Sequence, residues 1–390
     1  MMRRTAIVGL AACLAGAPAA SAGVRETVIK SGLNTPRHLV LTSAGLLVTE
    51  AGTGGPAGPA NCATGPATEG AGTSQYCTGS TGSISTISPG GRTIPVLSKL
   101  PSVIEVAISE VTGPSAIAYG HGQQAVTIDD FLVNEDGSNG LVPKPFGSAF
   151  GTLRLISAHG TRVVDIAAFA AVHPQSSLSL GTLPGETAWD SDPYDVVAYR
   201  GGWAVADAGA NDVLYVSAAG RVSLLARFPA VSEQVPAGVL GNPTPITVKA
   251  QAVPTSVAVG PDGALYVGLL RGVPSNPGTA EVYRLVPGHK PAIWARGLTS
   301  ITAIAFDRRG RLLATEYNTG GLLSPANAPG ALVRVSSDGR TVTTLPIHAL
   351  YQPTGVAVSD DGTVYVSNYG NSNTVTSSRG GEIVKITGLY

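Results

Sequence analysis

The stretch PTSVAVGPDGALYVGL (residues 254–269) returns near the C-terminus as PTGVAVSDDGTVYVSN (353–368). Each copy contains a proline, an alternating apolar run, an Asp-Gly pair and a second alternating run. Alternation with a period of two is typical of a half-buried β-strand, and Asp-Gly favours the positive φ angles that a tight hairpin turn needs. The sequence therefore predicts one β-hairpin that recurs, which indicates a repeat architecture.

The same hairpin pattern occurs four more times, at TPRHLVLTSAGLLVTEAG (35–52), GPSAIAYGHGQQAVTIDD (113–130), DPYDVVAYRGGWAVADAG (192–209) and SITAIAFDRRGRLLATEYN (300–318). A third alternating segment follows each hairpin, at 82–91, 151–160, 212–220, 280–288, 330–339 and 381–388. A fourth follows the first five, at 93–100, 162–169, 221–228, 291–298 and 341–350.

The last copy has no fourth segment, but RETVIKSGL (25–33) precedes the first hairpin, where a fourth strand belongs. Pairing an N-terminal strand with three C-terminal ones leaves no open sheet edge. We therefore expect an all-β fold, a six-bladed β-propeller with four-stranded blades, whose ring is closed by an N-terminal strand that completes the last blade.

The spacing between copies predicts insertions at about 51–81, 131–150, 174–191 and 230–250. These segments are rich in Gly, Pro, Ser and Asn and have no helical period, so we expect surface loops. Insertions at these points of a propeller emerge on one face, and loops crowded on one face of a rigid scaffold are where binding is expected.

The N-terminus has the layout of a secretory signal, with Arg3 and Arg4, the apolar stretch Ala6–Ala15 and the small residues Ala20-Ser21-Ala22. We therefore expect residues 1–22 to be a cleaved signal peptide, residues 23–390 to form one propeller domain, and the protein to be extracellular or in the cell envelope. No later apolar run has the length of about 18 residues that a membrane span needs.

Two cysteines remain after the predicted cleavage site, Cys62 and Cys77, fifteen positions apart. In a secreted chain such a pair predicts one disulfide. The 390 residues contain 25 basic and 25 acidic side chains, and this balance argues against a nucleic-acid partner or a polybasic membrane contact. We expect a monomer.

Several stretches resemble the secreted ScyD/ScyE family, notably DAGANDVLYV (207–216), QAVPTSVAVGPDGALYVGLLRGVP (251–274), PTGVAVSDDGTVYVSNYG (353–370) and GEIVKI (381–386). The resemblance covers nearly the whole mature chain. It implies a secreted six-bladed propeller related to NHL-repeat and gluconolactonase-like folds, and it brings no established activity.

Polar residues recur at the end of the second strand in five of the six repeats, namely Glu50, Asp129-Asp130, Asp207, Glu316 and Asn368, while the fourth repeat has Gly268-Leu269. Strand equivalence places them together on the insertion-bearing face. Either each one accepts backbone N–H bonds at a turn, or several carboxylates gather a hard cation such as Ca²⁺. With Asn211, and with His38 and Asp195 near the start of inner strands, they are the candidate ligand-binding residues.

His38 has two interpretations, a hydrogen-bonded loop histidine or a group that faces a central channel as acid, base or ligand. The sequence contains no GxSxG, HExxH, Walker or paired CxxC motif. We therefore expect a propeller, non-catalytic or with catalysis that no motif reveals, that binds a small molecule, a glycan or a protein on its looped face. The alternatives are a metal-dependent lactonase or esterase of the gluconolactonase type, although its Glu-Gly-Pro-x-Trp opening is replaced by NTPRHL (34–39), and a structural envelope protein.

Overall fold

The computed structural model describes residues 23–66, 73–129, 149–174, 190–239, 241–325, 327–348, 350–371 and 380–390. The predicted signal peptide and most of the predicted insertions at 131–150 and 174–191 lie outside these residues. In the described part of the chain the structure is almost entirely β, and each predicted hairpin is present. Gly263 and Gly362 of the two quoted Asp-Gly turns have φ angles of 74° and 86°, as the pattern predicts.

The strands of the first half of the chain form three antiparallel sheets, each named here by its first strand. The β2 sheet contains β2 (Pro36–Thr42), β3 (Gly45–Glu50), β5 (Thr73–Ile87), β6 (Thr93–Glu105) and β7 (Glu110–Thr112), with β4 (Cys62–Pro66) paired to β5. The β8 sheet contains β8 (Pro114–Gly120), β9 (Gln123–Ile128), β10 (Thr152–Ser157) and β11 (Gly160–Asp165). The β12 sheet contains β12 (Pro193–Tyr199), β13 (Gly202–Asp207), β14 (Asp212–Ser217) and β15 (Val222–Arg227).

Three more such sheets follow in the second half. The β18 sheet contains β18 (Pro254–Val259), β19 (Leu265–Leu269), β20 (Ala280–Leu285) and β21 (Ala292–Leu298), and the β22 sheet contains β22 (Ile301–Phe306), β23 (Leu312–Glu316), β24 (Ala331–Val335) and β25 (Val342–Thr344). The β26 sheet contains β26 (Gly355–Val358), β27 (Val364–Asn368) and β28 (Gly381–Thr387), and its outer strand is β1 (Arg25–Leu33).

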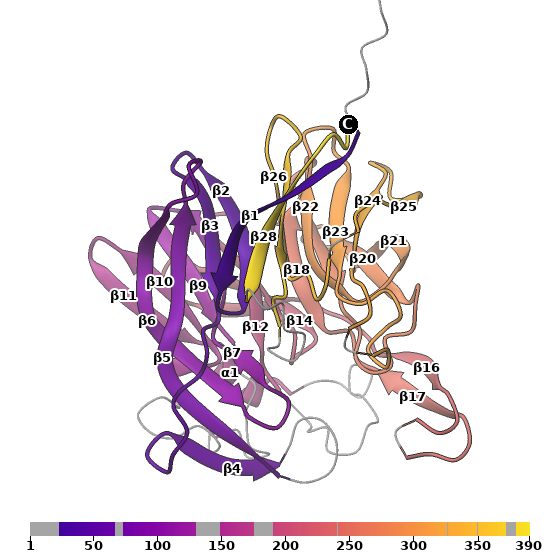
Figure 1. Ribbon diagram of the computed structural model, residues 1–390, viewed down its shortest axis with the longest axis horizontal. Coiled ribbons are helices and arrows are strands. Elements are labelled where there is room, and N and C mark those ends of the chain that lie inside the picture. Colours follow the sequence, from indigo (N-terminus) through magenta and orange to yellow (C-terminus); the bar gives the residue numbers. More distant parts are fainter. Residues whose placement is uncertain are drawn as a thin grey trace, which may run out of the picture.

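Strand β1 pairs antiparallel with β28, with Arg25 opposite Thr387 and Leu33 opposite Gly381. Figure 1 shows the two strands side by side near the middle of the view. The segment before the first hairpin is therefore the fourth strand of the last sheet, as the strand count predicts.

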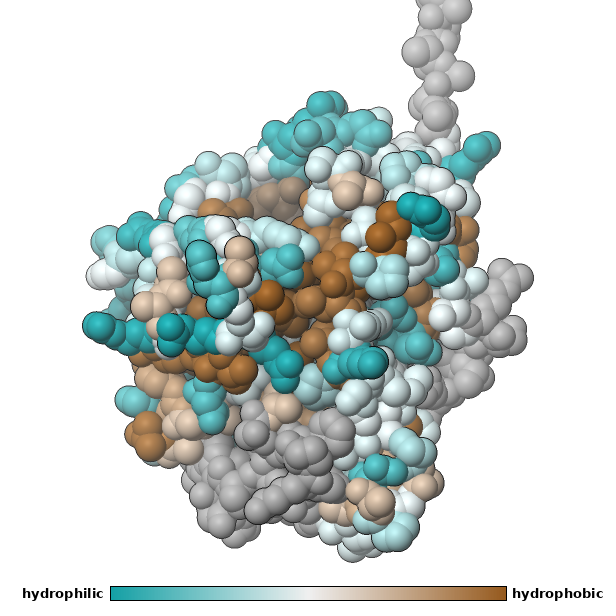
Figure 2. All heavy atoms as spheres, turned by 90° about the vertical axis from the view of Figure 1, so that its left-hand side faces the viewer, coloured by the Kyte–Doolittle hydropathy of each residue, from teal (hydrophilic) through white to brown (hydrophobic). Residues whose placement is uncertain are grey.

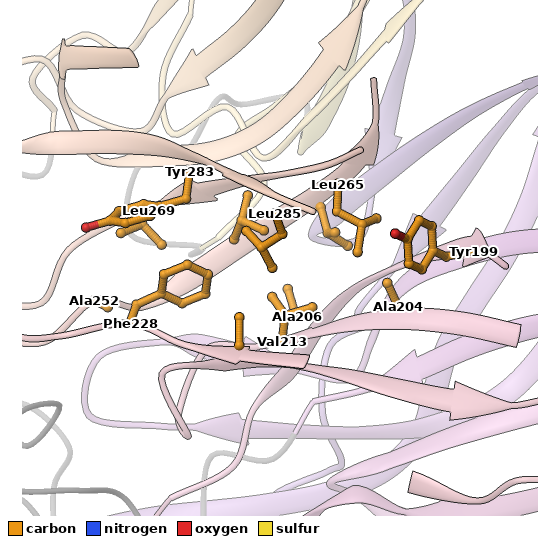
Figure 3. Close-up of a cluster of buried hydrophobic side chains, with 13 residues drawn as sticks. Tyr199, Ala204, Ala206, Val213, Phe228, Ala252, Leu265, Leu269, Tyr283 and Leu285 are labelled. Atoms are coloured by element: carbon orange, nitrogen blue, oxygen red, sulfur yellow. The ribbon is translucent and has the colours of Figure 1, made fainter. Parts of the chain in front are cut away.

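Apolar side chains fill the space between successive sheets. Figure 3 shows one such layer, in which Phe228, directly after β15, and Tyr283 of the β18 sheet meet edge to face with ring centroids 5.0 Å apart. A comparable layer joins Leu39 and Val48 of the β2 sheet to Ile383 of the β26 sheet. Each buried Leu, Val or Phe contributes about 2 kcal/mol by leaving water, so these layers hold neighbouring sheets face to face.

Some apolar side chains remain at the surface. Figure 2 shows the side of the molecule that lies at the left of Figure 1, where apolar residues gather in a hollow near the middle of the face and polar residues surround them. Exposed apolar side chains of the described residues include Val163 on the outer strand β11. A single exposed apolar residue such as Val163 is normal on a folded protein and marks no site by itself.

Two predicted insertions contain strands. The insertion at 51–81 supplies β4 and the first half of the long strand β5, where Cys62 lies directly opposite Cys77 and is bonded to it. The insertion at 230–250 contains a hairpin, β16 (Val231–Val235) and β17 (Ile246–Ala250). Figure 1 shows β4 and this hairpin at the same, lower end of the molecule.

The predicted fourth strand at 162–169 is wrong in its second half. Strand β11 ends at Asp165, and the helix α1 (Ile166–Val172) follows. The Asp165 side chain accepts a hydrogen bond from the Ala168 N–H at 2.8 Å and caps the helix, and the alanine-rich segment IAAFAAV favours a helix once it is capped.

Candidate functional site

The strand-end polar residues bind backbone N–H groups of their own sheet. In four sheets the acceptor at the end of the second strand meets the segment that leads into the first strand. The bonds are Asn34 N to Glu50 Oε2 at 2.7 Å, Asp192 N to Asp207 Oδ1 at 2.6 Å, Thr299 N to Glu316 Oε1 at 2.8 Å and Tyr351 N to Asn368 Oδ1 at 2.7 Å. This geometry favours the backbone-capping interpretation, because a repeated fold leaves the same N–H to be satisfied in each sheet.

The β18 sheet has Leu269 at this position and so lacks the side-chain acceptor. Asn211 of the preceding sheet supplies an acceptor instead. The Asn211 side-chain oxygen accepts the Val253 N–H at 2.9 Å, and its amide donates to Gln251. Asp130 lies outside the described residues, while its neighbour Asp129 is 2% exposed.

Burial favours the neutral form of the strand-end carboxyls. It raises the pKa of Glu316 to about 7 and that of Asp207 to about 6, and it also raises the pKa of Glu50. Within the described ranges no group of three or more His, Cys, Asp and Glu side chains is arranged to hold a metal ion. The described strand-end carboxyls bond to backbone N–H groups, and the calcium interpretation, which also included Asp130, stays a prediction.

Each first strand begins at or near a leading residue, Pro in five sheets and Ile301 in the β22 sheet, and the two positions after it lie where successive first strands are joined. In four sheets the first position is a small hydroxyl residue that donates to a carbonyl of the next first strand. The bonds are Ser115 to Tyr194 O, Thr255 to Ile301 O and Thr302 to Pro353 O, each 2.6 Å, and Thr354 to Pro36 O, 2.7 Å. The backbones of successive first strands are thereby joined.

Two sheets depart from this pattern at both positions. The β2 sheet has Arg37-His38 and the β12 sheet has Tyr194-Asp195, where the others have pairs such as Thr302-Ala303. These two sheets flank the β8 sheet, and the four exceptional side chains meet each other. The Arg37 Nη1 atom lies 3.2 Å from the Tyr194 hydroxyl, and the His38 Nε2 atom lies 3.6 Å from the Asp195 Oδ1 atom.

The His38–Asp195 pair lines a small pocket with room for about one water molecule, together with Ser115, Thr255, Thr302 and Thr354. Asp195 is 5% exposed and accepts the N–H groups of Val196 at 2.7 Å and Val257 at 2.8 Å. Burial raises the pKa of the Asp195 carboxyl, and His38 counteracts the rise. The structure thus brings together two of the predicted site residues and places His38 in a pocket rather than in a surface turn.

Arg37 is the centre of a larger buried network. Its side chain is 3% exposed and donates to the Tyr194 hydroxyl, to Asn371 Oδ1 at 2.7 Å and to the Val111 carbonyl at 2.8 Å. The Asn371 amide in turn lies 3.2 Å from Glu110 Oε1 and 3.3 Å from the Tyr317 hydroxyl. We call Arg37, Glu110, Asp129, Asp192, Tyr194, Tyr317 and Asn371 the Arg37 cluster.

Carboxyls of the Arg37 cluster are strongly perturbed. Burial raises the pKa of Asp129 to about 7, although Arg37 lowers it. Burial, with the repulsion of Asp129, Asp207 and Asp190, raises the pKa of Asp192 well above its usual value. Among the described residues, Asp129 Oδ1, Asp192 Oδ1 and Arg37 Nε are buried atoms with no hydrogen-bond partner.

The sequence analysis identified Asp195 and His38 but missed Arg37 and Tyr194. A comparison of the repeats with each other could have found them. At the position where the other four repeats have Ser or Thr, the first repeat has Arg37 and the third has Tyr194. Tyr317 directly follows the end of β23, and Asn371 lies shortly after the end of β27. Nothing in their local sequence identifies them as site residues.

Residues 350–373 match the NHL repeat family. Similar solved structures include a protein from Thermus thermophilus described as an oxidoreductase of the glucose dehydrogenase type, 14% identical over 94% of this chain and 100% of that one, with a TM-score of 0.50. Virginiamycin B lyase from Staphylococcus aureus is 12% identical over 93% of this chain and 98% of its own, with a TM-score of 0.48. A gluconolactonase-family protein is 11% identical over 94% and 92%, with a TM-score of 0.47.

No curated protein sequence matches significantly. At these identities the likeness shows the fold alone, and the fold is a β-propeller with at least one NHL repeat. Among the residues that the structure describes, no helix is long and apolar enough to cross a membrane.

Proposed function

We propose that the chain is a six-bladed propeller whose ring is closed by β1. The proposal is supported by the β1–β28 pairing, by the hydrogen bond from Thr354 to the Pro36 carbonyl, and by the apolar layer between the β26 and β2 sheets. Contacts between first strands run from β2 through β8, β12, β18 and β22 to β26, and β26 contacts β2.

The protein is an exported monomer of the ScyD/ScyE type in this proposal, with residues 1–22 removed on export. The support is the three-part N-terminal sequence, the family resemblance, and the Cys62–Cys77 bond, which suits an oxidising compartment. N-terminal sequencing of exported protein should begin at Gly23, and light scattering should give the mass of one mature chain.

The function is the binding of a small polar molecule at the Arg37 cluster, on the insertion-bearing face. The observation behind this proposal is the set of buried, unpartnered polar atoms on Arg37, Asp129 and Asp192. Each such atom costs about 1–3 kcal/mol. Buried atoms without a partner also occur elsewhere in the described residues, for example on Trp203 and Arg271, and the support for a ligand is that three of them belong to one cluster. The cluster also uses residues that depart from the repeat, and the fold alone does not require them.

A thermal-shift screen of polar metabolites tests this function. A ligand of the cluster should raise the melting temperature of the mature chain and should lose its effect in Tyr194→Phe, which removes the hydroxyl that Arg37 contacts. Tyr365→Phe is a matched control, because Tyr365 lies on β27 outside the cluster. If no compound distinguishes the two variants, the binding function at this site is wrong and a structural role in the envelope becomes the better hypothesis.

A metal-dependent lactonase is the alternative function. The described carboxyls do not form a metal-binding set, so no catalytic step is assigned to such an ion. The His38–Asp195 pair offers acid–base chemistry at the pocket, which is the observation that favours an enzyme. Elemental analysis of the purified protein before and after chelation tests the alternative, and a stoichiometric divalent ion would favour it.

A further inference from the structure

We propose that the Arg37 cluster takes a neutral, hydroxyl-rich ligand, a sugar or a polyol. This inference rests on the proposed binding function and names the chemical class of its ligand. It follows from the kinds of hydrogen-bonding atoms that the cluster leaves unpaired and from the charges around them.

The unpaired atoms are of both kinds. Arg37 Nε carries an N–H and needs an acceptor, whereas Asp129 Oδ1 and Asp192 Oδ1 are acceptors and need donors when their carboxyls are ionised. The Tyr194 hydroxyl accepts from Arg37 through a lone pair, so its own proton remains for a ligand oxygen. The ligand must therefore present donors and acceptors close together.

A hydroxyl group donates one hydrogen bond and accepts two, so neighbouring hydroxyls on one ligand satisfy this mixed set. An ammonium group has donors only, and it would leave the Arg37 N–H unpaired beside a like charge. A carboxylate or phosphate has acceptors only, and it would leave both aspartates unpaired.

Charge also disfavours an anionic ligand. Arg37 is the central cation of the cluster, and it faces Glu110, Asp129 and Asp192. Asp190 and Asp207 add further negative charge beside Asp192. A neutral ligand avoids the repulsion from the ionised carboxyls among these groups and still forms a charge-assisted hydrogen bond with Arg37, which is about twice as strong as a neutral one.

The arrangement at Arg37 sets the place of the ligand. Two of the three guanidinium nitrogens are already bonded, to Tyr194, Asn371 and the Val111 carbonyl, so the side chain is fixed and only Nε is left. Because the Arg37 side chain is already fixed, binding costs little side-chain entropy, and the donor favours ligands that place an acceptor at that one point. The cluster is therefore preorganised for an uncharged polar group of one shape.

Isothermal titration of the full mature chain at about pH 7 with four matched probes tests the ligand class. Glucose and myo-inositol are the neutral probes, glucosamine carries an ammonium group, and glucuronate carries a carboxylate. At concentrations up to about 20 mM, dissociation constants in the millimolar range are measurable. We expect at least one neutral probe to bind more tightly than both charged probes.

Asp129→Asn and Asp192→Asn should each weaken that binding by about tenfold, since the amide brings an NH2 donor to a place where the carboxyl offers an oxygen acceptor. Asp338→Asn is the control, because Asp338 lies in an exposed turn and should leave the affinity unchanged. Both cluster substitutions keep the side-chain shape, and thermal unfolding checks that each variant is folded.

The outcomes separate the two proposals. Binding of glucosamine or glucuronate that exceeds the neutral probes, and that the cluster variants weaken, would overturn the ligand class and leave the binding function intact. Absence of binding by both neutral probes would also overturn the ligand class. Equal binding of a neutral probe to all three variants would place it elsewhere and overturn the proposal for this cluster.

Discussion

Replacing Glu316 with glutamine should remove a large part of the pH dependence of stability. The Glu316 carboxyl is 6% exposed, and burial raises its pKa from 4.5 to about 7 against the lowering effect of one N–H from Thr299. The folded protein therefore holds this proton more tightly than the unfolded chain does. The stabilisation is complete below pH 4.5 and is lost as the pH rises through about 7.

The magnitude follows from the size of the shift. A pKa difference of about 2.5 units at about 1.4 kcal/mol per unit corresponds to about 3 kcal/mol of unfolding free energy lost between pH 4.5 and pH 8. The introduced glutamine would not titrate, and its side-chain oxygen would still accept the Thr299 N–H. Relative to the native protein, Glu316→Gln should thus become more stable with rising pH, by about 3 kcal/mol over this range.

Urea unfolding of both proteins between about pH 4.5 and pH 8 measures this difference. The comparison isolates Glu316, because Asp129 and Asp207 contribute equally to both curves. A stability difference that stays constant within about 0.5 kcal/mol would refute the reasoning, since that is the usual error between matched variants. Repeating the pH 8 measurement with calcium and with chelator tests the alternative role. Calcium should leave the native protein unchanged if Glu316 is a backbone cap.

Three further predictions concern the framework. Deleting residues 23–33 removes β1 and opens an edge of β28, so light scattering should show unfolding or oligomerisation. Removal of Leu389-Tyr390 should change far less. Equal behaviour of the two truncated proteins would refute the role of β1. Unreduced protein should have a mass about 2 Da below the dithiol, and reduction of the Cys62–Cys77 bond should leave far-ultraviolet circular dichroism nearly unchanged, because the bond lies in an insertion. Thr354→Val removes the hydroxyl that donates to the Pro36 carbonyl and should lower the free energy of urea unfolding by about 1–3 kcal/mol. Thr343→Val, at an exposed position, should lower it by under about 0.5 kcal/mol. Equal losses would contradict the role of Thr354 in joining the β26 and β2 sheets.

The strands were predictable because each hairpin has a clear period of two and an adjacent turn signal. The exceptions have physical causes. The first half of β5, in TSQYCTGSTG (73–82), lacks an alternating apolar pattern and is a strand through its pairing with β4 and β6. Strand β25 ends at Thr344, two residues before Pro346, which cannot donate to a ladder, so the predicted strand to 350 is shorter.

The candidate site was only partly predictable. Recurrent polar residues such as Glu50 and Asn368 attracted the sequence analysis, yet recurrence marks a need of the repeated fold, and the structure shows them bonded to backbone. The residues that gather at Arg37 differ from sheet to sheet. Their proximity depends on how distant sheets meet, and no local pattern contains that information.

Both ends of the described propeller lie away from the Arg37 cluster. Arg25 pairs with Thr387 at one end of the β1–β28 ladder, and Leu33 leads toward the insertion-bearing face at the other. Figure 1 shows the N-terminal end of β1 and the C-terminus together at the upper end, with β4 and the β16–β17 hairpin at the lower end. The protein can therefore be immobilised on a sensor surface through a tag at either terminus, and the insertion-bearing face will point into solution. A ligand screen in that orientation samples the cluster without obstruction from the support.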